Sequence, residues 1–324
     1  MKRPEGLVKL HGDASNRTYW RGRRPDGGTF VVMELPEGNQ SVSEEITNLK
    51  ERGAELPFVN IGRFLKNGGI PVPELLEDAS RERRLILEDV GDLTLAKNLE
   101  GGSAGQILRW YRKAIDLKVQ LEHLKPDRSC VAFRRSFDET LFNWEFDHFL
   151  EYGLEARGIH LQEADRKIFH QQTRFITFAL TRLPQLFVHR DFQSRNLMIQ
   201  GERLRLIDFQ DALLGPCQYD LVSLLRDSYV VLEPKTVEAL IEYYLAKKPP
   251  PDAAFFRKTF DWMTVQRKLK DAGRFVYIDR VKKNPGFLPF IPASLGYVHE
   301  ALERQPELQP LNDLLKRHLP EFRS

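Results

Sequence analysis

The spacing of hydrophobic residues changes near residue 90. Before this point, short apolar runs alternate with Gly, Asp and Pro turns, which is the pattern of β-strands joined by tight connections. The runs at residues 7–10, 18–21, 29–33 and 84–87 predict strands. One helix is expected among them, because Ser41 and Glu44 form a capping box and Arg52-Gly53 supplies a stop. The first 90 residues therefore predict a small antiparallel sheet of five strands with one helix.

After residue 90 the apolar positions follow a helical period. Helices are predicted from about 107 to 124, where a stripe of apolar residues ends before Pro126, and at 138–152, 163–183, 218–229, 237–246 and 255–272. The middle of this region is different. The short apolar run at 186–189 predicts a strand that leads into a loop, and the runs at 197–199 and 204–207 predict a hairpin. The chain is therefore expected to divide into residues 1–90 and residues 91–324.

Composition limits the classes of partner. Lys and Arg total 49 against 46 Asp and Glu in 324 residues, a net charge of +3 that is too small for a nucleic-acid or membrane partner. Cys130 and Cys217 lie far apart in the sequence and form no C-x-x-C pair, so we expect structural thiols in a reducing compartment. No run of eighteen apolar residues occurs. We therefore expect a cytoplasmic protein that acts on a small soluble molecule.

The strongest chemical signal lies in the predicted strand, loop and hairpin. Residues 189–196 read H-R-D-F-Q-S-R-N and residues 208–209 read D-F, which matches H-R-D-x-x-x-x-N followed by D-F. Phosphoryl transfer needs a carboxylate that orients the attacking hydroxyl and two further oxygen ligands for a metal. We predict Asp191 as the base and Asn196 and Asp208 as ligands of Mg²⁺. The alternative is that both Asp residues are ordinary turn residues, but two linked motifs at this spacing argue against it.

A second signal lies between the first two predicted strands. The small polar residues of segment 12–18 can point backbone N–H groups and hydroxyls toward phosphate oxygens. Gly12, Ser15, Asn16 and Arg17 are the candidate nucleotide contacts. A plain hairpin turn explains the same residues equally well.

A third signal follows the strand at 84–87. The apolar run leaves through an acidic linker that ends at Gly91, and backbone groups at Glu88 and Val90 are candidates for binding an adenine edge where two lobes meet. A simple interdomain linker is the alternative.

Together, the segments 189–196, 207–209, 12–15 and 87–92 resemble the aminoglycoside phosphotransferase-type kinases, and the similarity covers nearly the whole chain. This resemblance implies an α+β, bilobal, protein-kinase-like fold. Residues 1–90 would form a nucleotide-binding lobe with a small antiparallel sheet and one helix, and residues 91–324 a larger, mainly helical lobe for catalysis and substrate binding. It also implies ATP and Mg²⁺ as cofactors.

Within that superfamily, segments 215–227 and 265–275 are most similar to the bacterial anomeric sugar kinases. Those enzymes phosphorylate the C1 hydroxyl of N-acetylmuramate or N-acetylglucosamine during cell-wall recycling. The resemblance therefore implies a small sugar and ATP as partners, without nucleic acid or membrane. We expect a monomer or a weak homo-oligomer.

The sequence departs from the protein-kinase pattern at three positions. Met33 occupies the place of the strand lysine that pairs with the α- and β-phosphates, so either Arg17 replaces it or binding rests on metal and backbone contacts. Gln193 replaces the catalytic-loop lysine, and Gln210 replaces the glycine of D-F-G. None of these changes removes the base or a metal ligand.

Several other polar residues have structural interpretations. We expect His189 and Arg190 to organise the loop, and Asp220 to stabilise the first turn of a helix. Gln266, Arg267 and Lys270 share one helical face, which is either a sugar-binding wall or, more commonly, a solvated surface. Trp144 and Trp262 are candidates for stacking on a sugar ring, but we expect both in the core.

Two competing functions remain open from the sequence. The first is a kinase for an aminoglycoside, a choline-like amine, homoserine or another sugar, and a cationic acceptor would need an acidic cleft. Glu139, Glu145, Asp147 and Glu151 fall on one predicted helix and are candidates for such a cleft. A pseudokinase that binds nucleotide without transferring phosphate is the alternative from another class. The missing strand lysine favours it, and the intact Asp191, Asn196 and Asp208 oppose it.

Overall fold

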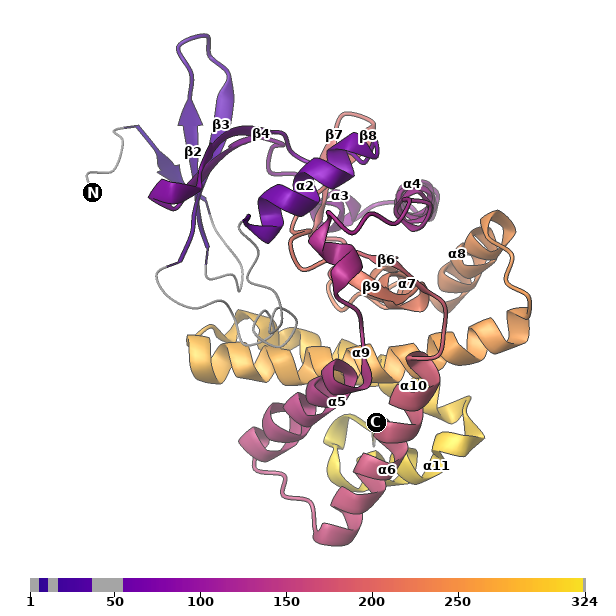
Figure 1. Cartoon of the computed structure of the whole chain (residues 1–324). Helices are drawn as coiled ribbons and strands as arrows, with labels where there is room; N and C mark the ends of the chain where they lie inside the picture. Colours follow the sequence, from indigo (N-terminus) through magenta and orange to yellow (C-terminus); the bar gives the residue numbers. More distant parts are fainter. Residues whose placement is uncertain (1–5, 11–16, 37–54, 323–324) are drawn as a thin grey trace.

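The computed structural model describes residues 6–10, 17–36 and 55–322 (Figure 1). Its described part consists of a smaller lobe built on one sheet and a larger, mainly helical lobe, which confirms the predicted α+β, bilobal architecture. The helix predicted at 41–53 and the candidate contacts Gly12, Ser15 and Asn16 lie outside the described residues.

The smaller lobe holds a five-stranded antiparallel sheet. Its order is β1-β2-β3-β5-β4, and Val32 of the central strand pairs with Trp20 on one side and Ile86 on the other. The four strands located from the sequence are confirmed. The fifth, β4, lies at the edge with most of its residues exposed, so it has no apolar alternation to reveal it. The strands are β1 (Val8–Lys9), β2 (Thr18–Arg23), β3 (Thr29–Glu34), β4 (Leu75–Ala79) and β5 (Arg84–Glu88).

Helix α2 (Pro57–Asn67) joins the two lobes and was not predicted. Val59 packs in the small apolar cluster of the sheet, whereas Ile61 belongs to the core of the larger lobe. Phe58 stacks on Phe209 with ring centroids 4.7 Å apart. A Cβ atom added at Gly62 would lie 3.1 Å from the Phe209 ring, so the glycine allows this close approach. Helix α2 therefore fixes the residue that directly follows Asp208.

The larger lobe is built around α9 (Ala253–Lys282), a 30-residue helix that runs across the molecule (Figure 1). It ends ten residues later than predicted, because Gly273 does not stop the helix. A Cβ at this position would lie 2.9 Å from the Phe149 backbone, so Gly273 brings α9 against the end of α5 instead.

The other predicted helices are confirmed, with shifted ends. The segment predicted at 138–152 forms α5 and continues as a π-helical turn, η3 (Phe149–Leu154). Three helices that the periodicity did not reveal are α3, α10 and α11. The helices are α3 (Leu95–Leu99), α4 (Ala104–Glu122), α5 (Glu139–His148), α6 (Glu163–Leu180), α7 (Gln218–Leu225), α8 (Pro234–Lys247), α10 (Ile291–Glu303) and α11 (Gln309–His318).

Two small strand pairs lie between the lobes and carry the motif loops. The predicted hairpin is confirmed as β7 (Leu197–Gln200) and β8 (Arg203–Leu206), and Gly201 in its turn has a φ of +59°. β6 (Gln185–Val188) pairs with β9 (Leu213–Pro216), which was not predicted because its Gly-Pro end is typical of a turn. These pairs bring the loop after β6 beside the loop after β8.

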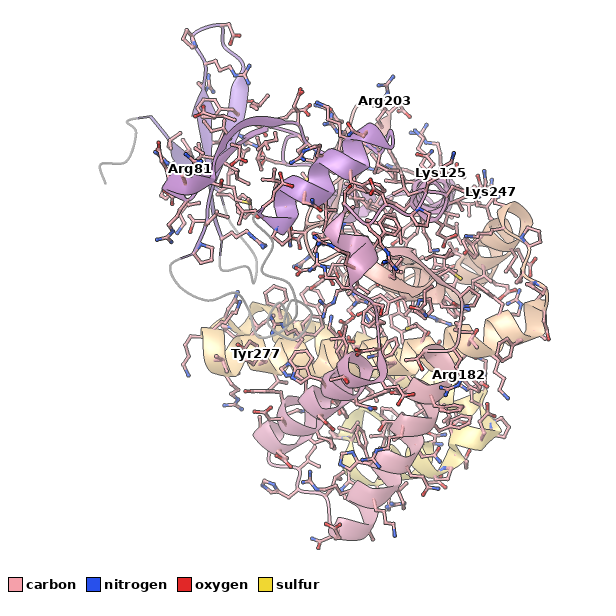
Figure 2. All side chains as sticks on the ribbon, viewed as in Figure 1. Arg81, Lys125, Arg182, Arg203, Lys247 and Tyr277 are labelled. Atoms are coloured by element: carbon pink, nitrogen blue, oxygen red, sulfur yellow. The ribbon has the colours of Figure 1, made fainter. Side chains whose placement is uncertain are left out.

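Basic side chains are exposed on both lobes, and the two cysteines form no disulfide. Exposed basic side chains such as Arg81, Arg203 and Lys247 are distributed over both lobes (Figure 2). Cys130 and Cys217 are both free, and Cys130 is buried. Among the described helices, none combines the length and the apolar character needed to cross a lipid bilayer.

The contact between Gly62 and Phe209 yields a test of the lobe connection. We expect Gly62→Leu to destabilise the fold by about 1–3 kcal/mol, because the new side chain would meet a buried aromatic ring. Gly105→Leu is the matched control, since Gly105 is also helical but has no heavy atom within 4 Å of an added Cβ. Thermal unfolding should give a lower Tm for the first variant alone. Equal Tm values for both variants would contradict the close packing of α2 on Phe209.

Candidate active site

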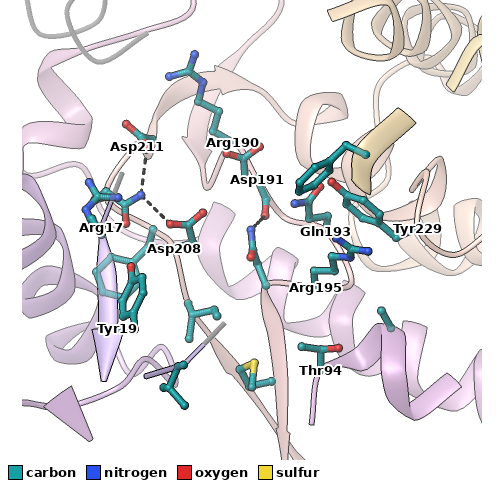
Figure 3. Close-up of a pocket in the computed structure, with 18 of the residues that line it drawn as sticks. Arg17, Tyr19, Thr94, Arg190, Asp191, Gln193, Arg195, Asp208, Asp211 and Tyr229 are labelled. Carbon is teal, nitrogen blue, oxygen red and sulfur yellow. Dashed lines mark hydrogen bonds between the residues drawn. The ribbon is translucent and has the colours of Figure 1, made fainter. Parts of the chain in front are cut away.

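A cleft of about 1230 Å³ lies between the two lobes. Its walls come from β2 and β3, the linker after β5, the two motif loops and α9. In Figure 3, Asp191 lies between two groups of side chains, with Arg17, Tyr19 and Asp208 on one side and Arg195 and Tyr229 on the other. The residues predicted at distant positions in the sequence thus line one cleft.

Two carboxylates beside α7 hold the loop of residues 189–196. Asp220, in the first turn of α7, accepts hydrogen bonds from the backbone N–H groups of His189, at 2.7 Å, and Arg190, at 3.0 Å. Asp227, just after α7, accepts from the backbone N–H of Ser194, at 2.8 Å, and from its hydroxyl, at 2.5 Å. Both carboxylates are buried, and burial raises the pKa of each. The structural role expected for Asp220 is thereby explained.

His189 and Arg190 are buried and bind other parts of the protein, as predicted. Nε2 of His189 donates to the carbonyl of Ile207, at 3.0 Å, which ties the first motif loop to the second. Arg190 has a φ of +79° and donates to Glu145, at 3.2 Å. Gln266 donates to the other oxygen of the Glu145 carboxylate, at 2.8 Å. The imidazole of His189 and the guanidinium of Arg190 are therefore both bonded within the protein.

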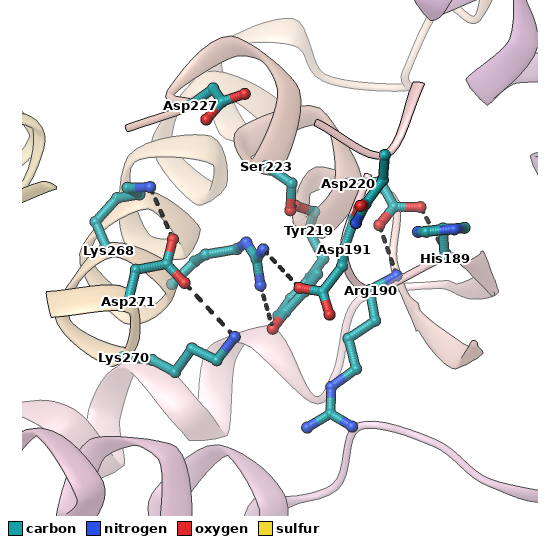
Figure 4. Close-up of polar contacts among 12 residues, drawn as sticks. His189, Arg190, Asp191, Tyr219, Asp220, Ser223, Asp227, Lys268, Lys270 and Asp271 are labelled. Atoms are coloured by element: carbon teal, nitrogen blue, oxygen red, sulfur yellow. Dashed lines mark hydrogen bonds and ion pairs between the residues drawn. The ribbon is translucent and has the colours of Figure 1, made fainter. Parts of the chain in front are cut away.

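Asp191 lies at the centre of the cleft, with 34% of its side chain exposed. Its Oδ1 accepts a hydrogen bond from Arg267 of α9 at 3.1 Å, and Arg267 also donates to the Tyr219 hydroxyl at 2.9 Å (Figure 4). Burial by itself would raise the pKa of Asp191, but the charges of Lys270, Arg267 and Arg190 outweigh it and lower the pKa to about 2. Asp191 is therefore ionised at neutral pH, with one oxygen held by α9.

Asp208 lies on the side of Asp191 away from Arg195 and Tyr229 (Figure 3), and Asn196 is bonded to the backbone of Asp191. The Asn196 side-chain amide donates to the backbone carbonyl of Asp191 at 2.9 Å, which leaves the amide oxygen available. Asp208 has a φ of +65°, a strained conformation of the kind that occurs at functional sites. Gln210 donates to Asp208, at 2.9 Å, and to Asp211, at 3.1 Å.

These oxygens suit a hard divalent cation. Burial and the negative charge of Asp191 raise the pKa of Asp208 to about 6, so the carboxylates repel each other when no cation lies between them. Carboxylate and amide oxygens are the ligands that Mg²⁺ prefers. In the part of the chain that the structure describes, no group of three or more His, Cys, Asp or Glu is arranged to hold a metal.

Arg17, Glu88 and Val90, which are expected to contact a nucleotide, line the cleft, whereas Met33 does not. Arg17 lies close to Tyr19 and Asp208 and lines the cleft (Figure 3). Met33 is fully buried in the apolar cluster of the sheet, so its side chain supplies no phosphate contact. Glu88 and Val90 lie on the cleft wall, but the carboxylate of Glu88 is paired with Arg205, at 3.0 Å, and its backbone N–H donates to Glu74.

The expectation of a solvated face on α9 is wrong. Gln266 and Arg267 are fully buried, and Lys270 lines the cleft with 15% of its side chain exposed. A polar helix face can be buried when its charges are paired, and here Arg267 bonds Asp191 while Lys268 bonds Asp271 at 2.7 Å.

The acidic acceptor cleft considered for α5 is not formed. Glu145 is fully buried and bonded to Arg190 and Gln266, so it is not available to a ligand. Asp147 is half-exposed and lies 3.7 Å from His170, on a different face of the helix. Of the two tryptophans, Trp262 is buried as expected, whereas Trp144 is only partly buried and lines the cleft.

An aromatic wall that sequence reasoning missed lies beside Asp191. The guanidinium carbon of Arg195 lies 3.8 Å from the ring centroid of Tyr229 and 5.0 Å from that of Phe290. Phe275 and Phe287 pack against the same rings. These residues come from separate helices and turns, so no local sequence pattern groups them.

Comparisons with known proteins agree with this geometry. Residues 6–256 match the model of the phosphotransferase enzyme family. The chain is 31% identical over 313 residues to a protein of Neisseria meningitidis serogroup B named N-acetylmuramate/N-acetylglucosamine kinase, covering 94% of this chain and 87% of that protein. A Pseudomonas aeruginosa protein of the same name is 29% identical over 319 residues, covering 96% of this chain and 88% of that protein.

A solved structure shows the same fold at lower sequence identity. The amicoumacin kinase hAmiN aligns with a TM-score of 0.62 and 13% identity, covering 94% of this chain and 90% of that chain. The family model covers more than half of the sequence, and the motif residues meet in one cleft. The chain therefore belongs to the phosphotransferase enzyme family.

Proposed function

We propose that this protein is an ATP-dependent kinase that phosphorylates the anomeric C1 hydroxyl of an amino sugar such as N-acetylmuramate or N-acetylglucosamine. The observation that carries the proposal is the meeting of Asp191, Asn196 and Asp208 in one interlobe cleft. The two named relatives, which align over more than nine-tenths of the chain, supply the acceptor class.

In the proposed reaction, Asp191 binds the acceptor hydroxyl and receives its proton. The acceptor oxygen forms a bond to the γ-phosphorus of ATP, and the bond from that phosphorus to the β,γ-bridging oxygen breaks to release ADP. A carboxylate with a pKa of about 2 is a weak base, so its main task is orientation, with proton uptake late in the transfer. An anomeric hydroxyl is more acidic than an ordinary alcohol, which suits such a base.

Asn196 and Asp208 are the proposed ligands of Mg²⁺. When bound, the ion neutralises charge that develops on the transferring phosphate. The side-chain amide of Asn196 is oriented by the Asp191 carbonyl, and Gln210 orients the Asp208 carboxylate. These hydrogen bonds fix the ligand oxygens before the nucleotide arrives.

The proposed nucleotide site lies on the small-lobe side of the cleft. Arg17 is the proposed substitute for the missing strand lysine and would neutralise phosphate charge, and it lies near Asp208. The peptide groups of Glu88 and Val90 would bind the adenine edge, where residues 1–90 meet residues 91–324. Gly12, Ser15 and Asn16 are proposed phosphate contacts on sequence grounds alone. Use of ATP and the free Cys130 and Cys217 fit a cytoplasmic enzyme. A monomer or weak homo-oligomer is proposed on sequence grounds alone.

Other acceptors are less well supported. A cationic drug or choline-like amine would need an acidic wall, and Glu145 is already bonded to Arg190. A pseudokinase would not need three converging oxygen groups with a strained Asp208.

Asp191→Asn tests the proposed base. We expect kcat to fall at least about 100-fold, because the amide can neither accept the proton nor keep the charge-assisted bond to Arg267. ADP release measures the rate, and phosphorus NMR identifies a sugar 1-phosphate. Asp147→Asn is the matched control, since Asp147 is half-exposed and outside the cleft lining. Near-normal turnover in Asp191→Asn would refute the assignment of Asp191 as the base.

Asp208→Asn tests the proposed metal ligand. Removal of the negative charge should weaken divalent-ion binding, so we expect the Mg²⁺ concentration for half-maximal rate to rise about 10-fold or more. Titration of activity with MgCl₂ at saturating ATP measures this shift, and EDTA should abolish turnover of the unaltered enzyme. An unchanged Mg²⁺ dependence would show that Asp208 does not hold the ion.

A further inference from the structure

One stretch of α9 carries more positive charge than the surrounding carboxylates neutralise. Arg267 is bonded to Asp191, and Lys268 is bonded to Asp271 at 2.7 Å. Lys270 lies 3.5 Å from the same Asp271 carboxylate, which it must share with Lys268 (Figure 4). Asp271 therefore compensates at most one of these two lysines.

Arg274, one helical turn after Lys270, has no carboxylate partner within 4.0 Å among the residues that the structure describes. Its guanidinium carbon lies 4.6 Å from the ring centroid of Tyr277, a residue of α9 labelled in Figure 2. Both Lys270 and Arg274 line the cleft. The wall of the cleft beside Asp191 therefore carries Arg274, which has no carboxylate partner in the described part of the chain, and Lys270, which shares Asp271 with Lys268.

These two cations are not simply solvated. Burial lowers the pKa of Lys270, and repulsion from Arg267 lowers it further, while burial also lowers the pKa of Arg274. A partly buried cation that lacks a carboxylate, as Arg274 does among the described residues, or shares one, as Lys270 does, is costly for a folded protein. Such an arrangement is typical of a site that binds an anion.

His148 of α5 faces the same part of the cleft. It is only 8% exposed, and its Nε2 atom has no hydrogen-bond partner. Burial, together with the charges of Arg274 and Lys270, lowers the pKa of His148 to about 3, so the imidazole is neutral. Trp144, one turn earlier on α5, stacks on this imidazole with centroids 5.5 Å apart. A buried polar atom without a partner indicates a position that a ligand can fill.

This cluster lines the same cleft as Asp191, and we place the acceptor on the α9 side of that carboxylate. The Asp191 carboxylate is bonded to Arg267 of α9, whereas Asn196 contacts the backbone carbonyl of Asp191 and precedes the hairpin that leads to Asp208. A hydroxyl that reaches Asp191 along α9 would carry the rest of its molecule over Lys270 and Arg274. Of the two acceptors in the name of the relatives, N-acetylmuramate has a carboxylate and N-acetylglucosamine has none.

We propose that Lys270, Arg274 and His148 form a subsite that binds the carboxylate of an acidic acceptor sugar and makes the enzyme prefer it to the neutral amino sugar. The inference rests on the proposed function, because it assumes that the acceptor is a sugar. A guanidinium and an ammonium together match a carboxylate by charge, and the imidazole adds a hydrogen bond. The structure thus assigns acceptor selectivity to α9 and α5.

The test compares the two sugars in Arg274→Gln and in the unaltered enzyme. We expect the ratio of kcat/KM for N-acetylmuramate to kcat/KM for N-acetylglucosamine to fall at least about 10-fold, because a charge-assisted bond to the carboxylate is lost. Arg280→Gln is the matched control, since Arg280 lies on the same helix with 62% of its side chain exposed. This control should leave the ratio unchanged.

Two outcomes would overturn the inference. An equal loss for both sugars together with a higher KM for ATP would assign Arg274 to the phosphates, although the proposed sugar kinase activity would stand. Equal binding of the two sugars to the unaltered protein without ATP, measured by calorimetry, would exclude a carboxylate subsite whether or not turnover occurs. Tighter binding of N-acetylmuramate that Arg274→Gln removes would support it. Absence of turnover with either sugar would refute the proposed function alone.

Discussion

The hydrogen bond between Arg267 of α9 and Asp191 connects the motif loop to a helix 76 positions away in the sequence. Arg267 is 1% exposed and also holds the Tyr219 hydroxyl, so one planar guanidinium fixes two elements at once. An arginine suits this place because its guanidinium stays charged when it is buried. The charges of Lys270 and Arg267 keep Asp191 ionised, and the Arg267 contact leaves its other oxygen toward the cleft.

The rest of the site is organised by polar groups that never reach a substrate. Asp220 and Asp227, at the two ends of α7, bind backbone N–H groups at the two ends of the motif loop. Glu145 receives Arg190 and Gln266 from separate elements. Each buried charge is costly by itself and is retained because another group satisfies it. Phosphoryl transfer depends mainly on positioning and electrostatics, so a network of this kind is what the reaction requires from a protein.

In the proposed function, the residues that choose the acceptor differ from those that carry the chemistry. The motif loops supply Asp191, Asn196 and Asp208 as the proposed base and metal ligands. The wall formed by α5 and α9 contains Lys270 and Arg274, the cations of the proposed acceptor subsite, and Gly273 lets these helices approach closely. Because a neutral His148 and Trp144 lie on the same wall, the cleft combines positive charge with an aromatic surface. Selectivity in this fold can therefore change on α5 and α9 while the motif loops stay as they are.

The sequence by itself determined the parts that depend on neighbours along the chain. Alternating and helical periods located four of the five described small-lobe strands and most helices, and fixed spacing identified Asp191, Asn196 and Asp208, which the fold brings into one cleft. It did not locate β4, β9 or α2, because an exposed edge strand, a Gly-Pro end and a helix shared between two cores leave weak periodic signals. Only the tertiary structure decided that the polar face of α9 is buried, that Glu145 is unavailable and that His148 lies beside Arg274. These outcomes depend on charged and polar residues that pair across 76 or 121 positions of the sequence, and the local spacing of residues does not indicate such pairs.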